Sequence, residues 1–490
     1  MLVHQCLKHV SSSSPLAGSL RALAFGCVTA GLLASCEPGT PVENQLPETR
    51  MSLDSINLSG EDRLNSVVTL SWFGSDADGY VVGYEVRVDE GPWVGTTRTD
   101  STMVLAIPAG LDSADLAVEV RAIDNEGGVD ASPARLNVPI KNSPPTAEFL
   151  GSSFPDAPVW NALTFQWNAS DPDGAESITD VELRVNGGSW RPIDRNQKLV
   201  SLVLTANGST SVYYGSQEVA AANWGYVLDT AGPSIMEVRA KDLAGAWSEA
   251  DTSVAVTVRM PRSSLLVVAS HSAAADAAWA DDFAALGLEY DLIDLLSNSG
   301  LERPRSWNPG FRHTLRGYEA LVVYSASSVM LDPQTGLTKL PLAHMAPAVQ
   351  RFSEAGGKVL VSTSLSSTSD LTDLVGTFPI DGLVASTGQV RLVMDSALVA
   401  QQVGFPNLKS SNILIGITPM VASADAEALY RGQLTKLSGW QGDNLMGALR
   451  RRQGAVQSVF LSFDLHRLDA QSGLLRRGLL QKVLINEFGL

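Results

Sequence analysis

Cysteine is nearly absent from this chain of 490 residues, and all three copies, Cys6, Cys27 and Cys36, stand near the N-terminus. The chain after Cys36 therefore cannot contain a disulfide, cysteine-ligated zinc or a cysteine nucleophile. Histidine is scarce too, and the copies beyond the N-terminal region show no zinc-ligand spacing: His271, His313, His344 and His466. A glycine-rich phosphate loop is also missing, so we expect no metal and no cofactor.

Basic residues are in the minority, with 35 Lys and Arg against 52 Asp and Glu, which gives a net charge of −17. Such a surface repels phosphates, so nucleic acid is excluded as a partner. Hydrophobic residues make up 44% and charged residues 18%, which excludes a mostly disordered chain. The length favours about three domains.

No apolar run reaches the ~20 residues that a membrane-spanning helix needs. The longest near the N-terminus covers residues 22–35 after Arg21, a length typical of a signal peptide. It ends in Leu33-Ala34-Ser35-Cys36, which resembles the bacterial lipobox. The resemblance implies that Cys36 is lipidated and anchors the protein to a membrane; the alternative is an ordinary small-residue cleavage site.

Glu37 follows the cysteine where an aspartate would imply retention in the inner membrane, so the resemblance indicates the outer membrane of a bacterial envelope. We therefore expect a lipoprotein signal peptide over 1–35. Residues 36–50 carry several prolines and little apolar content, which predicts a lipid anchor and an extended tether.

Three sequence blocks occur twice in the same order: 69–79 returns at 164–174, 84–93 at 181–190 and 118–124 at 236–242. Each block alternates apolar and polar residues and is followed by turn-forming residues, which is typical of half-buried strands. The repeats predict two β-sandwiches, over 51–142 and 143–261.

These repeats resemble fibronectin type III or related immunoglobulin-like modules, in which a tryptophan on the second strand packs under an aromatic residue on the third. Trp72 with Tyr84 fits that pattern, whereas Trp167 in the second copy faces Val181. The second copy also carries an aromatic and polar insertion after Trp190. That insertion is either a binding loop or an additional hairpin that covers an edge strand.

From residue 262 onwards the hydrophobic pattern changes to continuous apolar runs at 265–269, 320–324, 359–361 and 459–463. Buried parallel strands have this pattern, and helices are predicted between them over 273–286 and 342–354. A closing helix is predicted near the end, with Leu474 on its apolar stripe and Arg476 on its polar face. We expect residues 262–490 to form an α/β doubly wound, flavodoxin-like domain.

The order of these segments also resembles the class I glutamine amidotransferase-like fold. Active members carry a cysteine nucleophile after the strand that follows a paired glycine, but this chain has Ser362-Thr363-Ser364 there. The resemblance therefore implies a degenerate domain. If the domain is an enzyme, serine-based hydrolysis by Ser364, His466 and Asp464 is the alternative, although no nucleophile-elbow motif is present.

Hydroxyl and histidine side chains follow the predicted strands, where doubly wound folds bind ligands. This placement predicts a polar ligand site made of Ser270, His271, Ser325, Ser362, Ser364 and His466. The alternative is that these serines only cap the helices that follow the strands.

Two Asp-x-Asp-Gly segments suggest calcium, with candidate ligands Asp76, Asp78, Asp171 and Asp173. Calcium needs six to eight oxygen ligands, and each segment supplies only two carboxylates, which favours tight turns.

Together these features favour a non-enzymatic lipoprotein of the cell surface or periplasm, with β-sandwich spacers and a C-terminal binding domain. The expected partners are the membrane and a small polar ligand, a glycan or a surface protein. A serine hydrolase and an adhesive structural stalk are the alternatives.

Overall fold

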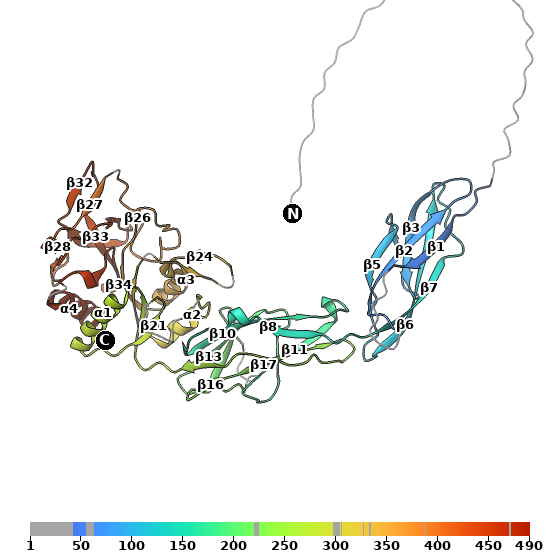
Figure 1. The fold of residues 1–490 in the computed structure, drawn as a ribbon, viewed down its shortest axis with the longest axis horizontal. Helices are drawn as coiled ribbons and strands as arrows, with labels where there is room; N and C mark the ends of the chain where they lie inside the picture. The colour runs from blue at the N-terminus through green and yellow to red at the C-terminus, as the bar shows by residue number, and fades with distance from the viewer. Residues whose placement is uncertain are drawn as a thin grey trace, which may run out of the picture.

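The computed structural model describes residues 43–54, 63–219, 225–296, 304, 306–326, 328–332, 335–386, 388–469 and 472–490. The predicted signal peptide, the lipidation site Cys36 and most of the tether lie outside these residues. Figure 1 shows three folded parts in a row: a first sandwich, a second sandwich and a C-terminal domain. No helix in the described ranges has both the length and the apolar character needed to cross a bilayer.

The first sandwich packs a three-stranded sheet on a four-stranded sheet. The three-stranded sheet has the order β1 (Glu48–Leu53), β2 (Val67–Ser75), β5 (Asp100–Val104). The four-stranded sheet has the order β4 (Val94–Thr96), β3 (Val81–Val88), β6 (Ser113–Asp124), β7 (Ala134–Lys141). In its core Trp72 meets Tyr84 edge to face, with ring centroids 6.3 Å apart, as the sequence pattern predicts. The sandwich begins at Glu48, inside the segment that we expected to be tether.

The second sandwich follows the same plan with a larger first sheet. That sheet has the order β15 (Gln217–Val219), β14 (Thr210–Tyr214), β13 (Leu199–Leu204), β10 (Ala162–Ser170), β8 (Thr146–Phe149). A four-stranded sheet has the order β12 (Arg191–Ile193), β11 (Ile178–Val185), β17 (Met236–Asp242), β18 (Asp251–Thr252). A three-stranded sheet has the order β16 (Pro233–Ser234), β19 (Val256–Arg259), β9 (Val159–Trp160). The repeated blocks lie on β2 and β10, β3 and β11, and β6 and β17, so the prediction of two β-sandwiches is confirmed.

The polar face of each sandwich carries the same ladder of ion pairs. In the first, Arg87 pairs with Glu119 at 2.5 Å and Arg121 with Glu85 at 2.6 Å across β3 and β6. Both guanidinium groups lie over the ring of Trp93, 4.4 and 4.2 Å from its centroid. The second sandwich repeats this arrangement with Arg184, Glu237, Arg239, Glu182 and Trp190. The polar side chains on this face therefore hold neighbouring strands together.

The insertion of the second copy contributes a hairpin, β14 and β15, that extends the sheet and contacts the C-terminal domain. The ring of Tyr213 lies 4.6 Å from that of His313, whose Nε2 is 2.9 Å from the carbonyl oxygen of Gly215. Trp160 also donates its indole N–H to the carbonyl of Leu292 at 2.9 Å. The second sandwich and the C-terminal domain are thus joined by specific contacts.

The first Asp-x-Asp-Gly segment holds the chain where it enters the first sandwich. Asp78 Oδ2 accepts the backbone N–H of Gln45 at 3.0 Å, and Asp124 Oδ2 accepts from the side-chain amide of Asn44 at 2.8 Å. Asp76 Oδ1 lies 3.4 Å from the backbone nitrogen of Asp78.

The second segment repeats these contacts at the junction between the sandwiches. Asp173 Oδ2 accepts the N–H of Ser143 at 2.8 Å, and Asp242 Oδ2 accepts from Asn142 at 2.6 Å. Asp173 Oδ1 also accepts the N–H of Ser66 in the first sandwich, at 3.2 Å. These carboxylates therefore fix the orientation of each entry segment.

The C-terminal domain is built on a nine-stranded mixed sheet. Five strands are parallel, in the order β21 (Asp291–Asp294), β20 (Leu265–Ser270), β22 (Ala320–Ser325), β25 (Lys358–Thr363), β34 (Ala455–Leu461). Four antiparallel strands continue it: β33 (Leu445–Arg452), β31 (Ala426–Gly432), β28 (Ala397–Ala400), β29 (Leu408–Lys409).

The domain departs from the expected purely doubly wound α/β arrangement, because four antiparallel strands continue the five parallel ones and the chain as a whole is mostly β. The described part of the domain also contains three short antiparallel pairs outside this sheet. β23 (Met330–Leu331) pairs with β24 (Thr338–Lys339). Within residues 382–437, β26 (Gly382–Leu383) pairs with β30 (Met420–Val421), and β27 (Gln389–Arg391) pairs with β32 (Thr435–Leu437). Strands this short carry too little hydrophobic periodicity to be predicted.

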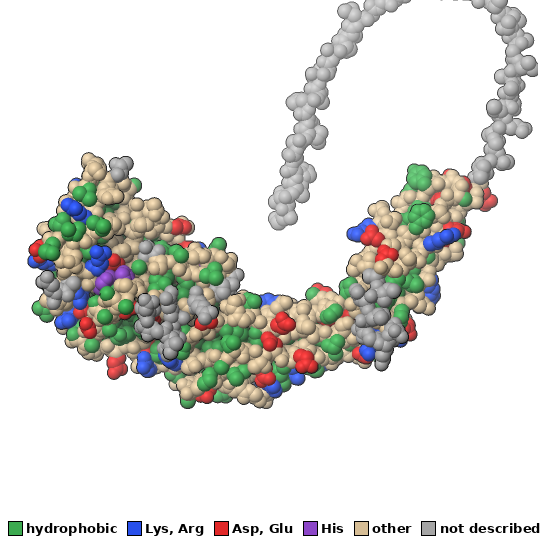
Figure 2. Space-filling model, viewed as in Figure 1, with side chains coloured by type: hydrophobic (Ala, Val, Ile, Leu, Met, Phe, Trp, Pro, Cys, Tyr) green, Lys and Arg blue, Asp and Glu red, His purple; other side chains and the backbone are tan. Residues whose placement is uncertain are grey.

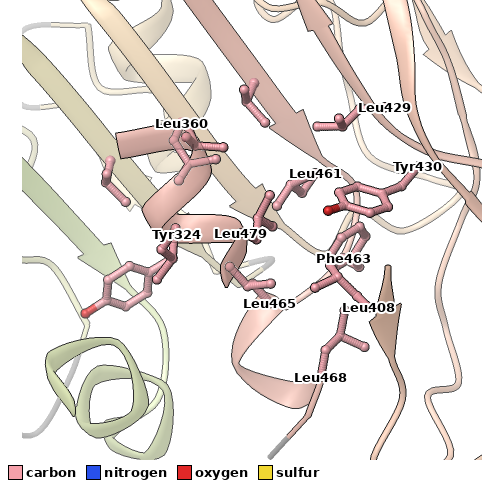
Figure 3. Close-up of a cluster of buried hydrophobic side chains, with 14 of the residues drawn as sticks. Tyr324, Leu360, Leu408, Leu429, Tyr430, Leu461, Phe463, Leu465, Leu468 and Leu479 are labelled. Carbon is pink, nitrogen blue, oxygen red and sulfur yellow. The ribbon is translucent and has the colours of Figure 1, made fainter. Parts of the chain in front are cut away.

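Helices pack on both faces of this sheet. α1 (Ala273–Leu286) and α4 (Leu474–Leu480) contribute to one buried cluster, and α2 (Phe311–Thr314) and α3 (Pro341–Glu354) to the other. Figure 3 shows part of the first cluster, in which Leu461, Leu465 and Leu479 lie close together.

The closing helix differs from the prediction. Leu474, expected on the apolar stripe, is 68% exposed, whereas Arg476, expected on the polar face, is buried and donates to Asp282 of α1 at 2.8 and 3.1 Å. After α4 the chain continues as a π-helix over Gln481–Glu487, which shifts the buried face away from the predicted α-helical spacing.

Candidate functional site

Three parallel strands carry polar side chains at their carboxyl ends, along one edge of the sheet. His271 follows β20, Ser364 follows β25, and Asp464 and His466 follow β34 at the 3₁₀ turn Leu465–Arg467. We call these four residues the strand-end cluster. Figure 2 shows histidine side chains at the surface of the C-terminal domain in this view.

Asp464 lies at the centre of the strand-end cluster. Its Oδ1 is 3.4 Å from Nε2 of His271, and the Ser364 hydroxyl lies near the same carboxylate. Burial alone would raise the pKa of Asp464, but the nearby polar groups of His271 and Ser364 and the positive charge of the imidazoles lower it overall. Asp464 is therefore an ionised acceptor at neutral pH.

The orientation of His271 is fixed by the residue after it. The backbone N–H of Ser272 donates to Nδ1 of His271 at 2.7 Å, so in the neutral ring the proton is on Nε2, which faces Asp464. Ser272 is also the N-cap of α1 and accepts the N–H of Ala275. The start of the helix thus holds the imidazole against the carboxylate.

His466 packs edge to face against His271, with ring centroids 4.7 Å apart. Burial and repulsion from His271 lower the pKa of His466 to about 4, although Asp464 opposes the shift. His466 is therefore neutral at pH 7, and a neutral imidazole offers one donor and one acceptor.

Three other predicted ligand residues lie inside the sheet. Ser270, Ser325 and Ser362 are at most 2% exposed, because each belongs to a strand that is buried up to its carboxyl end. Ser362 Oγ donates to the carbonyl of Phe463 at 2.9 Å and accepts the N–H of Leu465 at 3.0 Å. Ser362 therefore positions the turn that carries Asp464, and its buried hydroxyl is already hydrogen-bonded to the backbone.

The strand-end cluster does not have the order of a hydrolytic triad. In a triad the histidine stands between the serine and the carboxylate and accepts the serine's proton. Here the Ser364 hydroxyl lies beside the Asp464 carboxylate, and Nδ1 of His271 accepts the N–H of Ser272. The residues meet, but as neighbours of one carboxylate.

Arg467 was not predicted from the sequence. Its Nη1 lies 3.8 Å from Asp464 Oδ2, and its side chain is 39% exposed, so it adds a cation at the edge of the strand-end cluster. The only sequence signal was its spacing of three residues from Asp464.

The predicted calcium ligands act as hydrogen-bond acceptors in the turns described above, and burial raises the pKa of Asp171. Within the described ranges, no group of three or more His, Cys, Asp or Glu side chains is arranged to hold a metal ion.

No protein-family model and no curated protein matches this chain. Solved structures with detectable similarity include the fibronectin(III)-like modules of Clostridium thermocellum CbhA, at 17% identity over 43% of this chain and 94% of theirs, with a TM-score of 0.17. The PKD1 domain of Vibrio anguillarum Epp matches at 18% identity over 20% of this chain and 99% of its own, with a TM-score of 0.15. A tetra-tandem repeat from the extending region of a large adhesion protein matches at 15% identity and a TM-score of 0.19, over 43% of this chain and about half of the repeat's length, 49%.

Proposed function

We propose that this protein is a lipid-anchored lipoprotein of the bacterial cell envelope, on the outer membrane, whose two sandwiches space a non-enzymatic binding domain from the bilayer. The observation that carries the binding role is the strand-end cluster, where an ionised carboxylate, two imidazoles and a hydroxyl meet at one sheet edge. The lipobox-like run before Cys36 supports the anchor.

The chemistry of the strand-end cluster favours a neutral ligand rich in hydroxyl groups, such as a glycan. The Asp464 carboxylate accepts hydrogen bonds only, and a neutral His466 adds an acceptor and a donor. Sugar hydroxyls supply both kinds of partner.

The order of the five parallel strands, with the second strand in sequence at the edge and the first beside it, is the flavodoxin-like order. This order supports the resemblance of the C-terminal domain to the degenerate amidotransferase-like fold. In that order, ligands bind beyond the carboxyl ends of the strands, where the strand-end cluster lies.

We expect Asp464→Asn to weaken glycan binding by about tenfold or more, because hydrogen bonds to a charged acceptor are worth about 1.5–3 kcal/mol. The measurement is binding of the labelled, purified chain to an array of immobilised oligosaccharides. Asp395→Asn, which changes an exposed carboxylate in the same domain, is the matched control.

Absence of any bound glycan, or equal binding by Asp464→Asn, would contradict the glycan-binding role. Labelling of Ser364 by a fluorophosphonate probe, lost in His466→Ala, would instead favour the serine hydrolase, because only a base-activated hydroxyl reacts in this way.

We expect Cys36→Ala to move the protein from the membrane fraction to the soluble fraction of the cell envelope. The acyl chains on a lipidated cysteine contribute about 0.8 kcal/mol for each buried CH₂, and the alanine variant cannot carry them. Fractionation followed by immunoblotting measures the change, with Ser35→Ala as a variant that retains the cysteine. The anchor is refuted if Cys36→Ala stays in the membrane fraction as firmly as the parent.

A further inference from the structure

A recess of about 610 Å³ lies where the hairpin turn at Ser216 meets the C-terminal domain. Its basic lining comes from α2, from the 3₁₀ turn Leu315–Gly317, from the last turn of α3 and from the start of β25: Arg312, Arg316, Arg351 and Lys358. Because Lys358 begins β25 and Ser364 follows its end, this recess lies at the opposite end of that strand from the strand-end cluster.

The side chains that line this basic recess are mainly positive, whereas the protein as a whole carries a net negative charge. The chain carries an excess of 17 negative charges, yet four cationic side chains line the recess and Glu319 is the one carboxylate among its lining residues. A concentration of one sign of charge in a recess raises the local concentration of ligands of the opposite sign.

Two of the four cations form no ion pair within the part of the chain that the structure describes, namely Arg312 and Arg351. Arg316 lies over the ring of Tyr213, 4.5 Å from its centroid, and Glu218 offsets part of its charge. Lys358 donates to the carbonyl of Phe488. Two guanidinium forks are therefore available to a ligand.

The arginines are also close enough to disfavour one another's charge. Partial burial lowers the pKa of Arg312, and the positive charges of Arg351 and Arg316 lower it further. Arg351 has a structural role as well, since a cation in the last turn of α3 interacts favourably with the helix dipole. That role does not account for Arg312 or Arg316, which lie outside α3.

We propose that this basic recess binds a small ligand with two or more adjacent anionic groups, such as phosphates or carboxylates. The guanidinium groups of Arg312 and Arg351 form paired N–H bonds to the oxygens, and Arg316 and Lys358 supply further positive charge. Because Ser216 of the second sandwich lines the recess, the complete site exists only when that sandwich is docked on the C-terminal domain.

The test is a calorimetric titration of the purified full chain with inorganic pyrophosphate and, separately, with citrate, in about 0.15 M salt. We expect saturable binding of at least one probe with a dissociation constant below about 1 mM. Arg312→Gln and Arg351→Gln should each weaken binding about tenfold or more. Lys436→Gln removes an exposed charge elsewhere in the same domain and should leave affinity unchanged.

Ser216→Glu provides a test that leaves the arginines in place. It puts a carboxylate on an exposed hairpin turn at the recess, so it should preserve folding and still abolish binding of both probes. The site is overturned if neither probe binds the parent saturably, if the arginine and Ser216 variants bind normally, or if Lys436→Gln loses affinity to the same degree. Pyrophosphate binding without citrate binding assigns the site to phosphates, and the reverse assigns it to carboxylates.

Discussion

Asp282→Asn should lower the free energy of unfolding of the C-terminal domain by about 3–5 kcal/mol. Asp282 of α1 is buried and accepts hydrogen bonds from Arg476 of α4 at 2.8 and 3.1 Å, and from Arg477 at 3.1 Å. Arg476 is also buried and donates to the backbone carbonyls of Leu468 and Asp469. Removing the carboxylate charge leaves a buried guanidinium without its counter-ion, which is far more costly than losing the pair as a whole.

Two further variants separate the loss of a buried counter-ion from the loss of an exposed ion pair and from the loss of the whole buried pair. Asp395→Asn removes the carboxylate of the exposed pair with Lys409, and should cost less than about 1 kcal/mol. The double variant Asp282→Leu with Arg476→Met replaces the pair by apolar side chains, and should be less destabilised than Asp282→Asn alone. Urea unfolding followed by circular dichroism measures all three. Equal stability of Asp282→Asn and the parent would show that the pair does not hold α1 against α4.

The Asp282–Arg476 pair also illustrates what sequence alone could not predict. Arg476 is charged and lies in a segment whose apolar residues have helical spacing, so this spacing places it on the solvent face. Its partner is 194 residues away, and only the packing of α4 on α1 brings the two together. The π-helical turn after α4 changes the residue spacing as well.

Other parts of the fold were predictable because their signals are local. The sandwich strands alternate apolar and polar residues and end in turn-forming residues, so the repeated blocks coincide with β2, β3 and β6 and with their second copies. The predicted helices over 273–286 and 342–354 coincide with α1 and α3. The antiparallel half of the C-terminal sheet was missed. Its strands β28 and β29 are only 4 and 2 residues long, and the 7 and 8 residues of β31 and β33 do not alternate regularly between apolar and polar.

The strand-end cluster was predictable in membership but not in connectivity. His271, Ser364, Asp464 and His466 all follow buried strands, and the carboxyl ends of parallel strands share one edge. The hydrolase alternative grouped Asp464 with His466, whereas in the structure Oδ1 of Asp464 lies 3.4 Å from Nε2 of His271. Ser270, Ser325 and Ser362 were predicted with the cluster because doubly wound folds bind ligands beyond the carboxyl ends of their strands, although the sheet buries these three side chains.

Acidification from pH 8 to pH 5 should destabilise the junction between the second sandwich and the C-terminal domain by about 2 kcal/mol through His313 alone. His313 is 1% exposed, and burial together with the positive charges of Arg316 and Arg312 lowers its pKa to about 4. Its Nε2–H donates to the carbonyl of Gly215, so Nδ1 is the unprotonated nitrogen. Nδ1 is buried and has no hydrogen-bond partner among the described residues, so a proton added there is not stabilised.

Stability falls with acidification because His313 has different pKa values in the unfolded and the folded chain. The unfolded chain binds a proton at His313 with a pKa of about 6.5, whereas the folded chain binds it only near pH 4. Between these values the unfolded state holds more protons, so stability is fully present above pH 6.5 and falls as the pH decreases towards 4. His466, whose pKa is also lowered, acts in the same direction within the C-terminal domain.

His313→Gln separates this titration from the other acid-sensitive groups. The glutamine side chain still offers an N–H to the carbonyl of Gly215 but cannot gain a proton. The free energy of unfolding of the variant should therefore change less between pH 8 and pH 5 than that of the parent. Scanning calorimetry at both pH values gives the difference, and adding His466→Gln should flatten the pH dependence further. An unchanged pH dependence in His313→Gln would mean that His313 has nearly the same pKa in the folded and the unfolded chain, which would require an acceptor for the added Nδ1 proton that the described contacts do not provide.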